Sequence, residues 1–99
     1  MIQRLATQLS KEERDLRVLA AVIENQPIGI VRLSKETGID EHKVRYSLRM
    51  LESDELIEPT PDGAVPVADI QERVTEINEG LDGLIERIHS LKASSESTR

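Results

Sequence analysis

Basic and hydrogen-bonding side chains between residues 42 and 49 carry the strongest chemical signal in the sequence. Four of them share one face of a helix, because they are spaced i, i+3, i+4 and i+7: His42, Arg45, Tyr46 and Arg49, with Lys43 beside them. The arginine fork matches phosphate oxygens and the O6 and N7 atoms of guanine, so this face could bind nucleic acid. The competing interpretations are a solvated helix face and, for Tyr46, a half-buried core aromatic.

The charges along the chain are segregated. Three bases and no acid lie between His42 and Leu51, whereas five acids and no base lie between Glu52 and Asp62. The 99 residues carry 19 acids and 13 bases, a net charge of −6 that ordinarily argues against phosphate binding. With nine Arg to four Lys, however, the composition resembles the surfaces of salt-loving archaeal proteins. In such proteins a negative total does not exclude DNA binding.

Other kinds of chemistry find little support. Cysteine is absent, which excludes disulfide scaffolds, zinc knuckles and thiol catalysis. The two histidines, His42 and His89, fall in separate predicted elements, and neither a nucleophile–base pair nor a phosphate-binding loop is present. We therefore expect a protein that is not an enzyme and that uses neither a cofactor nor a metal.

Nothing in the sequence predicts a membrane segment. The longest apolar run, Val18 to Ile23, is six residues, whereas a membrane span needs about 20. The first four residues do not lead into the apolar core of a secretory signal. The expected location is the cytoplasm. With a single aromatic residue, the core must be built from aliphatic side chains.

Two helical segments are predicted at the N-terminal end. Residues 1–9 form a short apolar arm with Ile2, Leu5 and Leu9 at helical spacing, which either packs on another element or extends the next helix. Ser10 and Glu13 match a capping box, which predicts a helix from residue 11 to residue 25. Its expected buried face is Leu16, Leu19, Ala20 and Ile23.

The central segment predicts two short helices joined by a tight turn. The first begins near Ile30 and ends at Thr37, because Gly38 suits a left-handed helix end. Asp40 can cap the second, residues 41–53, which turns Val44, Leu48 and Leu51 inward. Residues 55–58 and 64–67 then flank a Pro-Asp-Gly turn, which is typical of a small β-hairpin.

A heptad pattern follows the hairpin. Apolar residues recur at alternating spacings of four and three: Ile70, Val74, Ile77, Leu81, Leu84, Ile88 and Leu91. This period predicts a coiled-coil helix over residues 68–92 that dimerises through these side chains, although the helix could instead fold back on its own domain. Gly80 and Gly83 each cost about 1 kcal/mol relative to Ala within a helix. Residues 93–99 are expected to form a disordered tail.

The order of these elements resembles the winged helix-turn-helix domain of MarR-like and ArsR-like transcription regulators, of a small archaeal and possibly haloarchaeal type. The similarity covers residues 12–67 and includes the run Leu33–Ile39. It continues with Val44, Leu48 and Leu51-Glu52 in the second helix and with Leu56-Ile57 before the wing. Glu55 departs from the family pattern, which usually has Gly there, and the wing is short and acidic.

The resemblance implies a mainly α fold with a small β-hairpin, in which residues 10–67 form the winged domain and residues 68–92 the dimerisation helix. It implies a homodimer that regulates transcription by binding double-stranded DNA, with helix 41–53 in the major groove. The implied reading face is Glu41, His42, Lys43, Arg45, Tyr46 and Arg49. Arg32, Ser34 and Lys35 on the preceding helix are the expected phosphate contacts.

A second hypothesis belongs to another class of function. The winged fold could serve as a protein–protein interaction module that does not bind DNA, using the acidic hairpin residues Glu55, Glu58 and Asp62. Loss of binding on removal of the basic face would indicate a DNA reader, whereas loss on neutralising the acids would indicate protein docking. Effector, operator and direction of regulation are not encoded in any recognisable motif.

Overall fold

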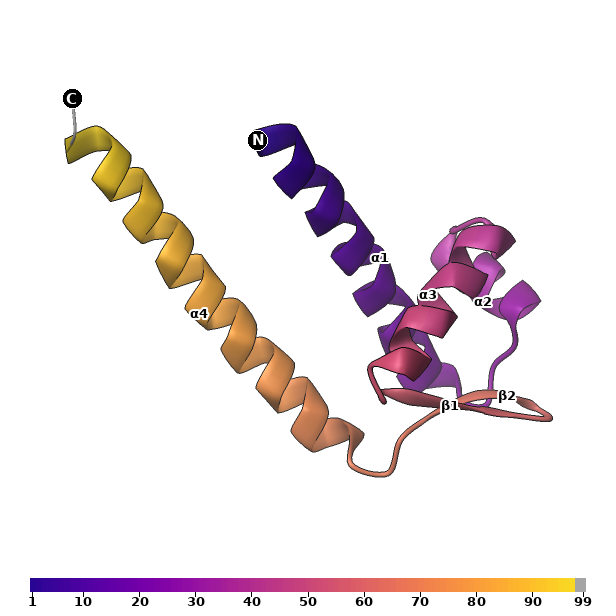
Figure 1. Ribbon diagram of the computed structural model, residues 1–99. Helices are drawn as coiled ribbons and strands as arrows, with labels where there is room; N and C mark the ends of the chain where they lie inside the picture. The colour runs from indigo at the N-terminus through magenta and orange to yellow at the C-terminus, as the bar shows by residue number, and fades with distance from the viewer. Residues whose placement is uncertain (98–99) are drawn as a thin grey trace. The chain divides into compact units, whose positions relative to one another are not determined.

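The computed structural model describes residues 1–97 and divides into two compact units, Met1–Ala68 and the segment from Asp69 onward. In the first unit, three helices precede a two-stranded hairpin (Figure 1). The elements are α1 (Ile2–Asn25), α2 (Ile30–Thr37), α3 (Glu41–Ser53), β1 (Ile57–Thr60) and β2 (Gly63–Pro66), followed by α4 (Ile70–Ser97) in the second unit. The predicted fold class, mainly helical with a small β-hairpin, is confirmed.

Helix α1 is longer than the predicted first helix. It runs without interruption from Ile2, so residues 1–9 extend it rather than form a separate arm. The predicted capping box is wrong, because the Ser10 hydroxyl donates to the carbonyl of Ala6 at 3.0 Å. No proline or glycine precedes Asn25, and a continuous helix satisfies the backbone N–H groups that a cap would have served.

The buried face of α1 is also rotated from the predicted one. Val18, Leu19, Ala21 and Val22 are buried, whereas Ala20 is exposed. Leu16 and Ile23 lie half-buried at the edges of this face. Asp15 lies three residues before Val18, on the side of the helix that is buried. A charged residue at this position made that side look like the exposed one in the sequence.

The turn between α2 and α3 has the predicted form. Gly38 adopts a φ of +73°, and its N–H donates to the carbonyl of Ser34 at 2.8 Å. The Ser34 hydroxyl donates to the carbonyl of Ile39 at 2.6 Å, and the N–H of Ile39 donates to the Thr37 hydroxyl at 3.2 Å. Asp40 occupies the N-cap position of α3, but its side chain makes no capping hydrogen bond.

Glu55 closes the C-terminal end of α3 in a left-handed conformation, with a φ of +60°. Its N–H donates to the carbonyl of Glu52 at 3.0 Å, and the N–H of Leu56 donates to the carbonyl of Leu51 at 2.9 Å. This pair of bonds defines a Schellman motif, which favours glycine at the left-handed position. The departure from the family's usual glycine therefore falls where that glycine is conformationally useful.

The hairpin begins two residues later than predicted, because Glu55 and Leu56 complete the helix end. Its strands pair antiparallel, with Ile57 opposite Pro66 and Thr60 opposite Gly63. Ile28 adds a bridge to the other side of β2. The N–H of Ile28 donates to the carbonyl of Ala64 at 3.2 Å, and the N–H of Ala64 donates to the carbonyl of Ile28 at 2.8 Å. The hairpin is thereby tied to the segment that joins α1 to α2.

An aliphatic core joins these elements, as the composition requires. It lies where α1, α2, α3 and the hairpin meet. Its fully buried side chains include Val18, Val22, Ile28, Leu33 and Val44. These contacts fix the orientation of α3, because one side of that helix is bound to the core and the other faces outward.

Helix α4 passes through Gly80 and Gly83 without interruption and extends to Ser97. The helix therefore includes residues 93–97, which the sequence led us to place in a disordered tail. No proline or glycine occurs in that segment to end it. Residues 98–99 of the predicted tail lie outside the described part of the chain. None of the helices within residues 1–97 has a stretch long and apolar enough to cross a bilayer.

Candidate nucleic-acid interface

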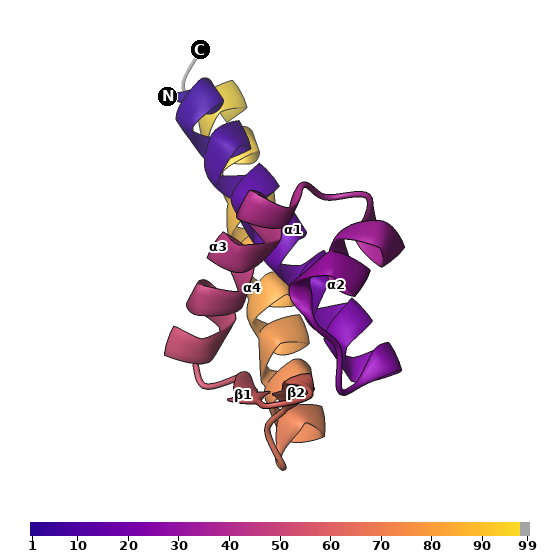
Figure 2. The same ribbon diagram turned by 90° about the vertical axis from the view of Figure 1, so that its right-hand side faces the viewer.

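The outward side of α3 carries the residues that the sequence predicts for DNA binding. Val44, Ser47 and Leu51 are buried on the inward side. The six predicted reading residues are all exposed: Glu41, His42, Lys43, Arg45, Tyr46 and Arg49. Helix α3 runs from the turn after α2 to the start of the hairpin (Figure 2). The structure thus places the predicted face on one accessible helix.

The reading residues divide into a centre and two flanks. With about 100° between successive helical residues, His42, Tyr46 and Arg49 lie opposite the buried side. Arg45 lies on the flank toward the hairpin, where it lines a cleft of about 490 Å³ with Pro61 and other hairpin residues. Lys43 lies on the opposite flank, where it lines a pocket formed with α1. Cations therefore border the central face on both sides.

Arg14 of α1 contacts two residues of α3, Ser47 and Tyr46, and this role was not predicted from the sequence. Its Nε donates to the hydroxyl of Ser47 at 2.8 Å. Its guanidinium carbon lies 5.4 Å from the centre of the Tyr46 ring, and one terminal nitrogen lies 3.5 Å from Asp15. Tyr46 is 53% exposed, so its ring is backed by a cation rather than buried in the core.

Ser47 could have signalled this contact. It lies on the inward side of α3 among apolar residues, and it is completely buried. A hydroxyl in such a position needs a hydrogen-bond partner from another element. Helical periodicity does not identify the element that supplies this partner, which is Arg14 of α1.

Replacing Ser47 with alanine should lower the free energy of unfolding by about 1–3 kcal/mol, because the part-buried Arg14 Nε then loses its acceptor. Urea denaturation at a fixed protein concentration measures the change, with the exposed Ser53→Ala as the control. Combining Ser47→Ala with Arg14→Leu should give less than the sum of the two single effects. Additive effects would show that the contact contributes nothing to stability.

The three residues predicted on α2 differ in their surroundings. Arg32 is exposed and lies 4.0 Å from Glu36, an ion pair of little energetic weight. Lys35 is exposed and lies in the last turn of α2. The Ser34 hydroxyl already donates to the carbonyl of Ile39, so its hydrogen is used in the turn. Arg32 and Lys35 are the better placed of the three to meet a phosphate.

The hairpin presents a surface of opposite charge. Glu55, Glu58 and Asp62 are all exposed. In the cleft between α3 and the hairpin, Glu52 and Asp62 accompany Arg45 and Arg49, so its charges balance. The side of α3 that faces the hairpin therefore carries no excess of positive charge. Among residues 1–92, whose side chains the structure describes, no group of three or more metal-ligating side chains is placed to hold an ion.

Comparison with known sequences agrees with this architecture. No curated protein gave a significant match. A family described as winged helix-turn-helix DNA-binding matches residues 11–58, from the middle of α1 into β1. The match includes all of α2, the turn and α3, and it does not distinguish MarR-like from ArsR-like regulators. Over residues 11–58 the chain is therefore similar to a family of winged helix-turn-helix DNA-binding domains.

Proposed function

We propose that this protein is a transcription regulator that binds duplex DNA as a homodimer, with α3 in the major groove. The observation that carries the proposal is the exposed basic face of α3 within a domain that is similar to a DNA-binding family. A helix is about 10–12 Å in diameter with its side chains, and the major groove is about 12 Å wide. Helix α3 is therefore of the right size to enter it.

Each part of the face has a distinct proposed role. His42, Tyr46 and Arg49 lie at the centre and would reach toward base edges. Lys43 and Arg45 lie on the flanks and would meet the phosphates that border the groove. Arg32 and Lys35 of α2 would bind the backbone nearby. The acidic hairpin repels phosphate, so α3 must supply most of the contact.

Dimerisation through α4 is the second part of the proposal. The C-terminal half of its heptad stripe is strongly exposed: Leu84 by 48%, Ile88 by 58% and Leu91 by 68%. A contiguous exposed apolar stripe is typical of an interaction site. Few phosphates are neutralised by one subunit, so two linked subunits on adjacent half-sites would gain the affinity that one lacks.

Replacing Leu84 and Ile88 together with glutamine should yield a monomer, because neutral polar side chains interrupt the stripe without weakening the helix. Sedimentation velocity should show the change in mass. Affinity for a duplex long enough for both subunits should fall about 100-fold, because the second contact is no longer intramolecular. His89→Gln/Ser90→Gln, at outer heptad positions, is the matched control. A variant that remains dimeric would exclude this stripe as the interface.

Fluorescence anisotropy with random-sequence duplex DNA tests the function itself. We expect binding whose logarithmic affinity declines linearly with the logarithm of salt concentration, the sign of phosphate contacts. A salt series reaching molar KCl includes conditions suited to an acid-rich protein. A folded protein that binds no duplex at any salt concentration would refute the proposal. The exposed acids Glu55, Glu58 and Asp62 would then favour a protein-docking module.

A further inference from the structure

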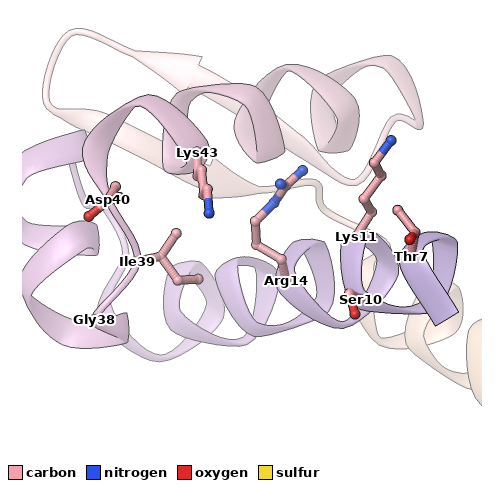
Figure 3. Close-up of a pocket in the computed structure, with 8 residues that line it drawn as sticks. All are labelled: Thr7, Ser10, Lys11, Arg14, Gly38, Ile39, Asp40 and Lys43. Atoms are coloured by element: carbon pink, nitrogen blue, oxygen red, sulfur yellow. The ribbon is translucent and has the colours of Figure 1, made fainter. Parts of the chain in front are cut away.

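A pocket of about 410 Å³ lies between α1 and the start of α3, on the side of α3 away from the hairpin. Thr7, Lys11 and Arg14 line it from α1, Lys43 lines it from α3, and Asp40 lies at its edge (Figure 3). Lys11 and Arg14 are distant in sequence from the predicted reading face. All of these residues belong to the first compact unit.

The pocket carries an excess of positive charge. Lys11, Arg14 and Lys43 face it against a single acid, Asp40. The side chains of Lys11 and Arg14 project from α1 toward α3, and that of Lys43 projects toward α1 (Figure 3). Asp15 lies 3.5 Å from a terminal nitrogen of Arg14 and offsets part of its charge. Lys11 and Lys43 add two further cations, and cations directed into one space repel one another unless an anion lies between them. The cleft on the other side of α3 has two bases and two acids and lacks this imbalance.

Arg14 is held in position before any ligand arrives. Its Nε is bonded to the fully buried Ser47, and Asp15 and the Tyr46 ring flank the rest of the guanidinium. A cation fixed in this way loses little conformational entropy when it binds. Lys11 and Lys43 are exposed and can adjust to the ligand. The Ser10 hydroxyl is used by Ala6, so Thr7 offers the additional hydroxyl in the pocket.

We propose that this pocket binds a phosphate of the DNA backbone, at the border of the groove that α3 enters. The inference rests on the proposed function. Lys43 belongs to both the pocket and the flank of the reading face, and Arg14 touches both the pocket and Tyr46. The pocket is therefore continuous with the proposed base-reading surface. A phosphodiester carries the negative charge and the oxygen acceptors that ammonium, guanidinium and hydroxyl groups bind.

This site gives α1 a direct part in DNA binding. The hairpin is acidic and cannot neutralise phosphates, whereas α1 supplies two cations on the opposite side of α3. The domain would then contact the DNA backbone through α1, whereas other winged domains use the wing for this contact. Contacts of this kind position the protein without reading sequence.

Lys11→Gln is the decisive variant, because Lys11 is outside α3 and makes no part of the proposed reading face. Anisotropy with random duplex at 50 to 200 mM salt should show a salt slope lower than the wild type by about 0.9, the loss of one phosphate contact. The ratio of wild-type affinity to variant affinity should therefore fall roughly 3-fold between 50 and 200 mM salt. Lys11→Arg should keep the wild-type slope, and Lys92→Gln, which removes a charge from α4, should also keep it.

The outcomes separate this inference from the proposed function. If the wild type binds duplex and Lys11→Gln has the same affinity and slope, the pocket is not a backbone site. If the wild type binds no duplex, the proposed function fails first and this inference falls with it. A second experiment titrates the protein with inorganic phosphate and monitors the amide resonances of Lys11 and Lys43. A response abolished by Lys11→Gln while duplex binding is unchanged would assign the pocket to a free phosphate-bearing ligand and overturn the inference.

Discussion

The Arg45→Ala/Arg49→Ala variant should bind duplex DNA at least about 30-fold more weakly than the wild type. The proposed contact of Arg49 with a base contributes about 1–3 kcal/mol, and the proposed charge-assisted contact of Arg45 with a phosphate contributes about 1.5–3 kcal/mol. If the two contributions add, their joint loss costs at least about 2 kcal/mol. Both side chains are exposed, so their removal should leave the fold intact. Anisotropy with a duplex of the preferred sequence measures the loss, and circular dichroism verifies that the variant is folded.

Two control variants separate the arginine fork from its charge. Arg45→Lys/Arg49→Lys keeps both charges, so it should retain most of the salt slope while losing preference among sequences. Arg4→Ala/Lys92→Ala removes the same charge from exposed positions outside α3 and should bind almost as the wild type does. An alanine variant with wild-type affinity would show that these arginines do not contact DNA.

Gly63→Ala should lower the free energy of unfolding by about 3 kcal/mol or more. Gly63 has a φ of +128°, a conformation that residues with a Cβ rarely adopt. A Cβ at this position would lie 2.5 Å from the backbone carbon of Ile28 and 2.7 Å from its nitrogen and oxygen. The substitution should therefore break the bridge between Ile28 and Ala64 and detach the hairpin from the core.

Gly29→Ser is the matched control for that substitution. Gly29 lies one residue from the same bridge, but a Cβ there would meet nothing within 4 Å. It is also the N-cap of α2, where serine is preferred over glycine by a few tenths of a kcal/mol. We expect Gly29→Ser to be as stable as the wild type or slightly more stable. Equal urea midpoints for Gly63→Ala and Gly29→Ser would contradict the packing described for Gly63.

The parts of the fold that local sequence determines could be predicted. Helix α3 begins and ends where the pattern places it, and Gly38 forms the left-handed turn. In both cases the signal is contained within a few neighbouring residues, such as a glycine after an apolar helix face. The bridge between Ile28 and Ala64 was not predicted, because it joins two segments that are distant in the sequence.

The errors arise where tertiary contacts or competing local bonds decide the outcome. The phase of α1 depends on which of two overlapping apolar series meets the core, and the charged Asp15 concealed the one that does. The hairpin starts late because Glu55 and Leu56 are taken up by the end of α3. Neither effect can be deduced from periodicity alone.

The candidate site shows the same division. The face of α3 follows from helical spacing, so its residues could be selected from the sequence. Arg14 and Lys11 could not, because they reach this site only through the packing of α1 against α3. Ser47 was the available clue, since a buried hydroxyl among apolar neighbours requires a partner.

Mapping the DNA-contacting surface by NMR tests the central claim most directly. The ¹H–¹⁵N spectrum of the full chain would be recorded as random-sequence duplex is added at low salt. We predict that the amide resonances of His42, Tyr46 and Arg49 shift most, while those of Glu58 and Asp62 in the hairpin change little. Shifts that spare α3 and gather on the hairpin, or a spectrum that does not change, would contradict DNA recognition by α3.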